Sequence, residues 1–212
     1  MKDTRPLPPY SPKVTSYANC KLTECNLVDP SRTINVGAII GRDDRIHVPT
    51  PEVQGWSPHG HLDMTFRDKN YIGSGLLVGP RHVVTAGHCV HGEEGWATSI
   101  SFTPGLNDTS RPFGSAKVKQ IFTVKEWTNN KEPQNDFALL ILDRDIGNQV
   151  GWYGLMTPSD AFLEKLTINV TGYPGDKGGK KLYTMEGQVG RYDSEILNYS
   201  IDTYGGQSGV GV

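Results

Sequence analysis

The chain has 212 residues, with 21 basic and 23 acidic side chains and a formal net charge of −2. This length is enough to bury a core in one large or two small domains, and the balanced charge gives no reason to expect a nucleic acid as partner. No run of about 18 apolar residues exists, so we expect no transmembrane helix and no membrane partner.

Residues 1–37 are polar, rich in proline and without a sustained hydrophobic period, which indicates an N-terminal extension or pro-segment. Their start lacks the apolar stretch of a signal peptide. Cys20 and Cys25 lie close enough in sequence to form a bridge, whereas Cys89 is predicted to be a buried free thiol. Because no C-x-x-C pair is present to build a site of four ligands, we expect neither a metal site nor a cofactor.

Short β-like runs separated by turn residues dominate the rest of the chain. The 25 glycines and 14 prolines are spread among them, which favours many turns over a helical bundle. One helix is predicted, at 157–166, with Ser159 as its N-cap. The pattern therefore predicts an all-β fold, either a barrel or a sandwich. The β-like runs are 71–79, 82–90, 98–105, 116–127, 136–142, 166–175, 182–192 and 196–206.

Three polar residues stand where such runs begin or end. His88, in VVTAGHC, follows an apolar β-branched stretch, so its imidazole can emerge at a strand end. Asp136, in NDFALLIL, comes just before a strongly apolar strand, and Ser208 stands among glycines in GGQSG. Acyl transfer needs a serine that attacks, a histidine that takes and returns the proton, and a carboxylate that orients the imidazole. We therefore predict a catalytic triad of these three residues.

The glycines around Ser208 permit a tight turn that exposes its hydroxyl. The amides of Gly206 and Ser208 are predicted to form the oxyanion hole, in which one donor contributes roughly 3–4 kcal/mol to the transition state. Each motif alone also fits an ordinary turn or a buried polar residue. Their joint occurrence, in the order histidine, aspartate, serine, is what favours the catalytic interpretation.

These three blocks, VVTAGHCV, NDFALLIL and DTYGGQSG, resemble the chymotrypsin-like serine peptidases. They look more narrowly like the bacterial glutamyl endopeptidase (V8-protease-like) branch. Residues 39–48 are similar to the start of the mature enzyme in that branch, and 170–189 resemble part of its second barrel. The likeness extends from about Ala38 to the end of the chain.

The resemblance implies two antiparallel β-barrels, the first at 38–150 and the second at 151–212, with the active site between them. In the first barrel, which we expect to close within 39–145, His88 and Asp136 should lie within hydrogen-bond reach, with Asp136 facing Nδ1. Its strands are expected at about 72–78, 82–86, 116–124 and 137–142.

The family's strands that follow the nucleophile have no counterpart here, so the second barrel is expected to be incomplete. We therefore expect a piece of a longer protein, or one chain of a cleaved enzyme whose C-terminal segment is a separate chain. The 212-residue chain by itself is expected to be inactive or nearly so. Relatives also often pair the cysteine that follows the catalytic histidine with one on a neighbouring strand, and the corresponding run 71–78 contains no cysteine.

The implied activity is that of a secreted serine endopeptidase made as a zymogen. It would hydrolyse protein or peptide substrates through an acyl-enzyme, after Glu and more slowly after Asp. Thr203 matches the family position that contacts the glutamate side chain of the substrate.

Three alternatives remain open. Asp202 has the spacing of the pocket carboxylate of trypsin-like enzymes, which would favour cleavage after Arg or Lys, although we interpret it as structural. A non-catalytic protease homologue would use the same cleft to bind a partner. An acyl hydrolase of the α/β type is disfavoured, because that fold places its serine first and needs βα repeats.

Overall fold

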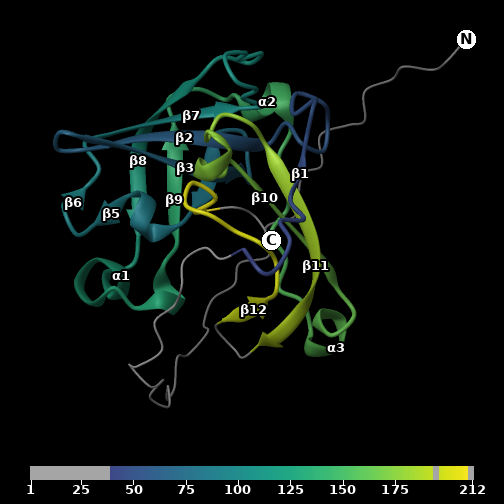
Figure 1. Cartoon of the computed structure of the whole chain (residues 1–212). Helices are drawn as coiled ribbons and strands as arrows, with labels where there is room; N and C mark the ends of the chain where they lie inside the picture. The colour runs from purple at the N-terminus through teal and green to yellow at the C-terminus, as the bar shows by residue number, and fades with distance from the viewer. Residues whose placement is uncertain (1–38, 193–195, 210–212) are drawn as a thin grey trace, which may run out of the picture. The chain divides into compact units, whose positions relative to one another are not determined.

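The computed structural model describes residues 39–192 and 196–209, so the predicted extension at 1–37 and its cysteine pair lie outside the described residues. Strands dominate, with a few short helices between them (Figure 1). In the described part of the chain, no helix is both long and apolar enough to cross a bilayer. The strands are β1 (Ile46–His47), β2 (His59–Phe66), β3 (Lys69–Leu77), β4 (His82–Thr85), β5 (His91–Gly92), β6 (Gly95–Trp96), β7 (Ser99–Pro104), β8 (Ala116–Thr123), β9 (Ala138–Leu142), β10 (Thr167–Gly172), β11 (Tyr183–Tyr192) and β12 (Leu197–Tyr199). The helices are α1 (Lys125–Asn130), α2 (Gly147–Val150) and α3 (Asp160–Leu163), with 3-10 turns η1 (Gly87–Cys89), η2 (Pro133–Asn135) and η3 (Gly175–Lys177).

Six antiparallel strands close into a barrel in the order β2-β3-β4-β9-β8-β7. The predicted all-β fold is therefore confirmed, and β3, β4, β8 and β9 lie within a few residues of the strands expected from the sequence. Alternate residues of β9 point inward, with Ala138, Leu140 and Leu142 buried. This alternation is the period-2 pattern of a strand with one face on a core.

The barrel interior is filled by one apolar cluster. Side chains from all six strands and from the turn that follows β4 contribute to it. Its fully buried members include Leu62, Leu77, Val83, Val90, Phe102, Leu140 and Leu142.

Strand β2 and helix α1 are among the elements that the sequence did not predict. Strand β2 was not expected because it begins His-Gly-His, yet His59 and His61 are both buried. The predicted run 116–127 breaks after β8, where the short helix α1 begins. The break lets Trp127 turn inward, and its Nε1 donates a hydrogen bond to the carbonyl of His91 at 3.0 Å.

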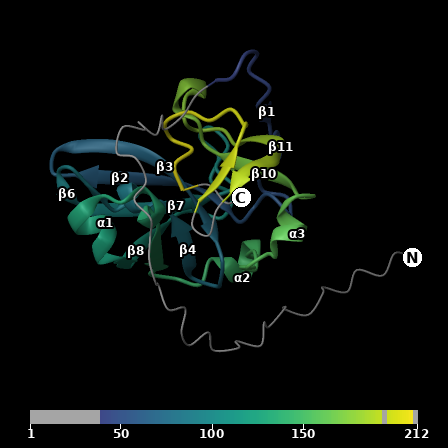
Figure 2. The same cartoon turned by 90° about the horizontal axis from the view of Figure 1, so that it is seen from below.

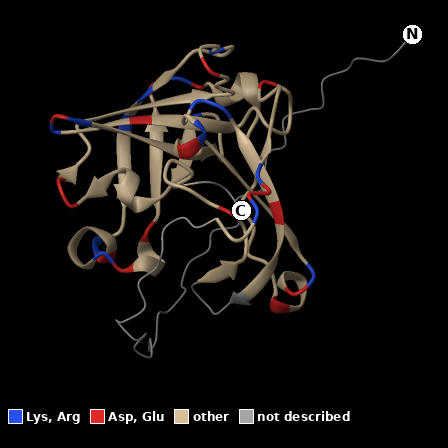
Figure 3. Cartoon of the chain, in the orientation of Figure 1, with Lys and Arg blue, Asp and Glu red and all other residues tan. Residues whose placement is uncertain are grey.

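A four-stranded sheet lies beside the barrel, as Figures 1 and 2 show. Strands β10 and β11 form an antiparallel pair from Thr167↔Gln188 to Gly172↔Tyr183, and β1 and β12 both pair with β11. The predicted helix is present as α3, although it is shorter than 157–166 and the Ser159 side chain makes no capping hydrogen bond. Basic and acidic residues are interspersed along both the barrel and the sheet (Figure 3).

Candidate active site

His88 lies in the turn η1, immediately after the apolar strand β4. The neighbouring Gly87 has no room for a side chain, because an added Cβ would lie 2.8 Å from the ring of Trp127. Trp127 therefore packs directly on the turn that carries the histidine. The His88 side chain remains 34% exposed, so its ring can reach a bound molecule.

Asp136 receives two hydrogen bonds from the same residue. His88 Nδ1 lies 2.7 Å from Asp136 Oδ2, and the backbone amide of His88 donates to Asp136 Oδ1 at 2.7 Å. The carboxylate thus fixes both the backbone and the ring of His88. With Nδ1 paired in this way, Nε2 is the ring nitrogen left to exchange a proton with a substrate or nucleophile.

The surroundings of His88 act on its pKa in opposite directions. Burial on its own would lower that pKa, but the hydrogen bond with Asp136 and the contact with Cys89 outweigh burial and raise the pKa above its ordinary value of about 6.5. A higher pKa makes the neutral imidazole a stronger base. It also moves the pH at which the neutral form predominates upward.

Two glycines shape the turn around Ser208. Gly206 has φ +100°, and a Cβ there would lie 2.5 Å from the carbonyl oxygen of Tyr173. Gly209 has φ +83°, and its added Cβ would lie 2.1 Å from the Oγ1 of Thr85. Both positions require glycine for conformation and for space, which is the physical reason for the motif GGQSG.

The barrel holds this turn through one buried serine of β3. The amide of Ser74 donates to the carbonyl of Ser208 at 2.8 Å, and its hydroxyl donates to the carbonyl of Gly206 at 2.8 Å. The same hydroxyl accepts a hydrogen bond from the Tyr173 amide at 2.9 Å, and Thr85 Oγ1 donates to the Ser74 carbonyl at 2.8 Å. The carbonyls of the turn are therefore tied down on the barrel side.

The amides of Gly206 and Ser208 were predicted as the oxyanion hole. Within 39–192 and 196–209, no residue accepts a hydrogen bond from either of these two amides. Both are therefore available as donors to a bound oxyanion, at a turn whose carbonyls are already paired.

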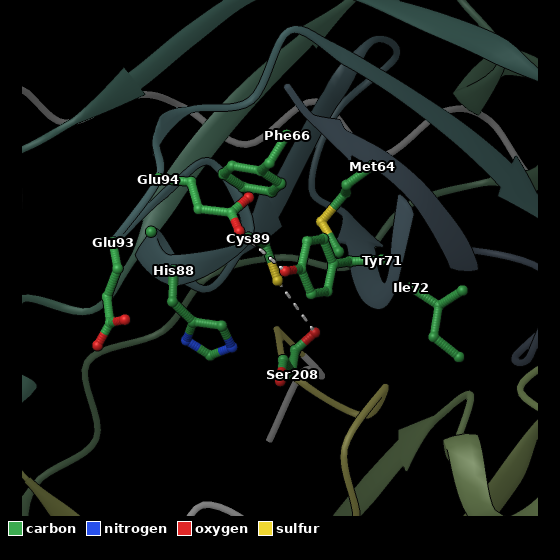
Figure 4. A pocket seen from close by; sticks show the side chains of 10 residues that line it. Met64, Phe66, Tyr71, Ile72, His88, Cys89, Glu93, Glu94 and Ser208 are labelled. Carbon is green, nitrogen blue, oxygen red and sulfur yellow. Dashed lines mark hydrogen bonds between the residues drawn. The ribbon is translucent and has the colours of Figure 1, made fainter. Parts of the chain in front are cut away.

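A pocket of about 360 Å³ brings the histidine and the serine together. Figure 4 shows the His88 ring and Ser208 near each other in this pocket, with Cys89 beside both. The Cys89 thiol lies 3.8 Å from the Ser208 carbonyl. Among the described residues, no hydrogen bond joins the His88 ring to the Ser208 hydroxyl, a contact that in serine hydrolases often tightens only with substrate bound. The other residues that line the pocket are mostly apolar, with two glutamates among them: Met64, Phe66, Tyr71, Ile72, Gly92, Glu93 and Glu94.

Thr203, the predicted specificity residue, and Asp202, whose pocket role was the alternative, do not line this pocket; they lie on the stretch that leads to the nucleophile turn. Thr203 is half-buried. Asp202 is only 1% exposed, and its carboxylate accepts hydrogen bonds from the amides of Ile40 at 2.7 Å and Asp44 at 3.1 Å.

The family model described as Trypsin matches residues 56–207, a stretch that includes His88 and Asp136 and ends directly before Ser208. This chain belongs to the trypsin family of serine endopeptidases. The predicted family is therefore confirmed, and the fold is the chymotrypsin-like one.

Relatives within the family include several glutamyl endopeptidases. The chain is 32% identical over 179 residues to the glutamyl endopeptidase of Bacillus licheniformis, covering 82% of this chain and 54% of that protein. It is 34% identical over 181 residues to a Bacillus subtilis protein named extracellular metalloprotease, covering 84% of this chain and 58% of the relative. A solved structure of a Glu endopeptidase in complex with MPD superposes with a TM-score of 0.72 at 32% identity, covering 82% of this chain and 80% of that one. The chain thus spans little more than half the length of the two curated relatives.

The name of the Bacillus subtilis relative raises the question of a metal. In the part of the chain that the structure describes, no three His, Cys, Asp or Glu side chains are grouped as metal ligands.

Sequence reasoning missed the residues that support the turn. Ser74 lies in an ordinary β-like run. Its role is visible only in the structure, where it contacts Gly206, which is 132 residues away in the sequence. Arg45, whose side chain contacts Gln207 across 162 residues, was missed for the same reason. Neither residue stands in a local motif that would have revealed its contact.

Proposed function

We propose that this protein is an endopeptidase that works through an acyl-enzyme on Ser208, with His88 as general base and Asp136 as the residue that orients it. The observation that carries the proposal is the pair of 2.7 Å hydrogen bonds between His88 and Asp136, beside a pocket that Ser208 also lines. A carboxylate so placed selects the tautomer with Nδ1 protonated and Nε2 free.

In the first half of the reaction, the Ser208 oxygen attacks the scissile carbonyl carbon while His88 Nε2 takes the hydroxyl proton. The carbonyl oxygen becomes an oxyanion that the amides of Gly206 and Ser208 would bind. When the intermediate collapses, the carbon–nitrogen bond breaks and Nε2 passes its proton to the leaving amine.

In the second half, a water molecule takes the place of the amine. Nε2 of His88 removes a proton from that water as its oxygen attacks the ester carbonyl. Collapse of the second intermediate breaks the bond to the Ser208 oxygen, which recovers its proton from Nε2 and releases the acid product. The same donors serve both halves, because both pass through the same type of oxyanion.

For specificity, we propose cleavage after Glu and more slowly after Asp. Support comes from the named activity of the Bacillus licheniformis relative and from the half-buried hydroxyl of Thr203, which can donate to a carboxylate.

The Arg/Lys alternative depends on a free carboxylate at Asp202. That carboxylate is instead buried and already accepts two backbone hydrogen bonds, from Ile40 and Asp44. A buried carboxylate satisfied by amides has little capacity left for a guanidinium or ammonium group. This favours a structural role for Asp202.

We also propose that the protein acts outside the cell after removal of a pro-segment at 1–37. The Bacillus subtilis relative carries the word extracellular in its name. Culture fractionation followed by N-terminal sequencing of the mature protein would test both points.

The test of the proposed function is a set of peptides that differ only in the residue before the scissile bond: Glu, Asp, Arg or Lys. We expect the full-length, processed protein to cleave the Glu peptide fastest, the Asp peptide more slowly, and the two basic peptides not measurably. Ser208→Ala should reduce kcat by a factor on the order of 10⁵ or more, whereas Ser99→Ala, at an exposed serine of β7, should leave kcat unchanged. Cleavage after Arg or Lys would move the pocket role to Asp202, and no cleavage by folded protein would support the non-catalytic homologue.

A further inference from the structure

Arg45, directly before β1, has a side chain with no exposed surface, and all five of its N–H donors are used. Nε and Nη2 donate to the two carboxylate oxygens of Asp43 at 2.9 and 3.0 Å. Nη1 and Nη2 donate to the two carboxylate oxygens of Asp176, at 3.0 Å from Nη1. The fifth donor, again on Nη1, reaches the side-chain oxygen of Gln207 at 3.2 Å.

Gln207 is the residue before Ser208 and is 3% exposed. Its side-chain oxygen also accepts a hydrogen bond from the backbone amide of Tyr204 at 3.0 Å. The backbone amide of Gln207 in turn donates to the Tyr204 carbonyl at 3.0 Å. The Gln207 side chain thus closes the turn 204–207 on itself. Arg45 holds the same oxygen from outside the turn.

The charges around Arg45 balance. Asp43 and Asp176 face it, and Lys177 pairs with Asp43 at 2.6 Å. The hydrogen bond from Arg45 holds the pKa of Asp43 far below its ordinary range, and the hydrogen bond from Asp43 raises the pKa of Arg45 despite its burial. Asp43 and Arg45 therefore stabilise each other's ionised form.

A buried guanidinium is costly unless every donor is paired, and an apolar side chain would fill the same space more cheaply. Arginine at position 45 therefore needs a reason beyond packing. Its two carboxylate partners use four donors, and only the fifth hydrogen bond leaves the cluster. That bond goes to the residue adjacent to the nucleophile.

We propose that Arg45 is a positioning residue for the nucleophile turn. Through Gln207 it fixes the backbone that aims the amides of Gly206 and Ser208 and the Ser208 hydroxyl. This inference rests on the proposed role of Ser208. A displacement of about 1 Å at a reacting group can lower the rate by on the order of 10²-fold. Loss of the Arg45 contact with Gln207, the residue next to Ser208, should therefore lower kcat.

The first variant is Gln207→Met, which has nearly the same length, removes the side-chain oxygen that accepts from both Arg45 and the Tyr204 amide, and leaves Arg45 with both carboxylates. We expect kcat for the Glu peptide to fall by at least about tenfold with KM changed less than about threefold, since the loss falls on transition-state alignment. The pH at which kcat/KM reaches half its maximum should not move, because the contacts of His88 are untouched. Amide hydrogen exchange across 204–208 should accelerate by at least about tenfold, because a local opening becomes easier.

Three further variants sharpen the result. Arg45→Lys keeps the charge but has three donors, and it should give an intermediate loss of kcat. In an Arg45→Met background, adding Gln207→Met should cause a smaller loss of kcat than it causes in the wild type, because the contact with Arg45 is already absent and only the hydrogen bond from the Tyr204 amide remains to be lost. Arg81→Met breaks an exposed arginine–aspartate pair with Asp145 and should leave both kcat and exchange unchanged.

A folded Gln207→Met protein whose amide exchange and kcat both stay within twofold of wild type would overturn the proposal, even if Arg45→Met fails to fold. If the wild-type protein shows no turnover, the proposed function fails on its own. In that case, faster amide exchange across 204–208 in Arg45→Lys than in Arg81→Met still supports the role of Arg45, and equal exchange in these two variants overturns it.

Discussion

Replacing Ser74 by alanine should weaken the fold and the active site together. Ser74 is 2% exposed, and its hydroxyl joins the carbonyl of Gly206 at 2.8 Å to the amide of Tyr173 at 2.9 Å. Ser74→Ala leaves both backbone groups unpaired in positions where Gly206 and Tyr173 are themselves buried. Each neutral group buried without a partner costs about 1–3 kcal/mol, and allowing for small shifts we expect a loss of about 2–4 kcal/mol in unfolding free energy.

Urea unfolding followed by tryptophan fluorescence measures this loss. With a slope of about 2 kcal/mol/M for a domain of this kind, the midpoint should fall by about 1–2 M at unchanged slope. Thr98→Val is the matched control, since its hydroxyl donates to the Thr65 carbonyl at 3.0 Å on the exposed surface, and its cost should stay within about 0.5 kcal/mol. A Ser74→Ala protein that loses less than about 0.5 kcal/mol would show that the serine does not tie the turn to the barrel.

Asp136→Asn should reduce kcat by a factor on the order of 10³–10⁴ by favouring the wrong tautomer of His88, and a decrease under tenfold in peptide hydrolysis would argue against the orienting role. Because the hydrogen bond with Asp136 raises the pKa of His88 and only neutral imidazole acts as base, wild-type kcat/KM should rise with pH through a midpoint above about 6.5, and the asparagine variant should shift that midpoint downward. Gly206→Ala combines a strained φ with a 2.5 Å clash and should abolish turnover, whereas Gly178→Ala, with φ +85° and open space, should cost only about 1 kcal/mol of stability; equal effects of the two on kcat would contradict the clash argument. Burial lowers the pKa of His59 to about 4. The stability that the neutral form contributes is therefore fully present above the unfolded pKa of about 6.5 and is lost as the pH falls toward 4, by up to about 3 kcal/mol. His59→Phe should flatten the decrease of the urea midpoint over that pH range, and parallel curves for the two proteins would refute the assignment.

The barrel strands could be predicted from the sequence because each one depends mainly on the apolar residues of its own short run. The run ALLIL is a short, continuous apolar stretch, so strand β9 could be predicted from the sequence alone. Strand β2 could not be predicted, because histidines give no apolar signal; only the structure shows His59 packed on Tyr153 and His61 packed on Tyr173. The helix α1 was missed because a tertiary contact of Trp127, and no local propensity, turns the chain there.

The same distinction applies to the site. His88, Asp136 and Ser208 each stand in a recognisable motif, and the geometry joins the first two by hydrogen bonds and brings the third into the same pocket. Their catalytic roles stay a prediction. Arg45 and Ser74 have no motif, because their importance depends only on which distant residue they meet.

Covalent labelling of Ser208 tests the central claim most directly. A fluorophosphonate probe should form a phosphorus–oxygen bond with the Ser208 hydroxyl as fluoride leaves and His88 takes the proton. Mass spectrometry of the full-length, processed protein should then find one adduct, on the peptide that contains Ser208, absent from Ser208→Ala and at least about 10³-fold slower to form in His88→Ala. A folded protein with no adduct, or with its adduct on another residue, would contradict the account.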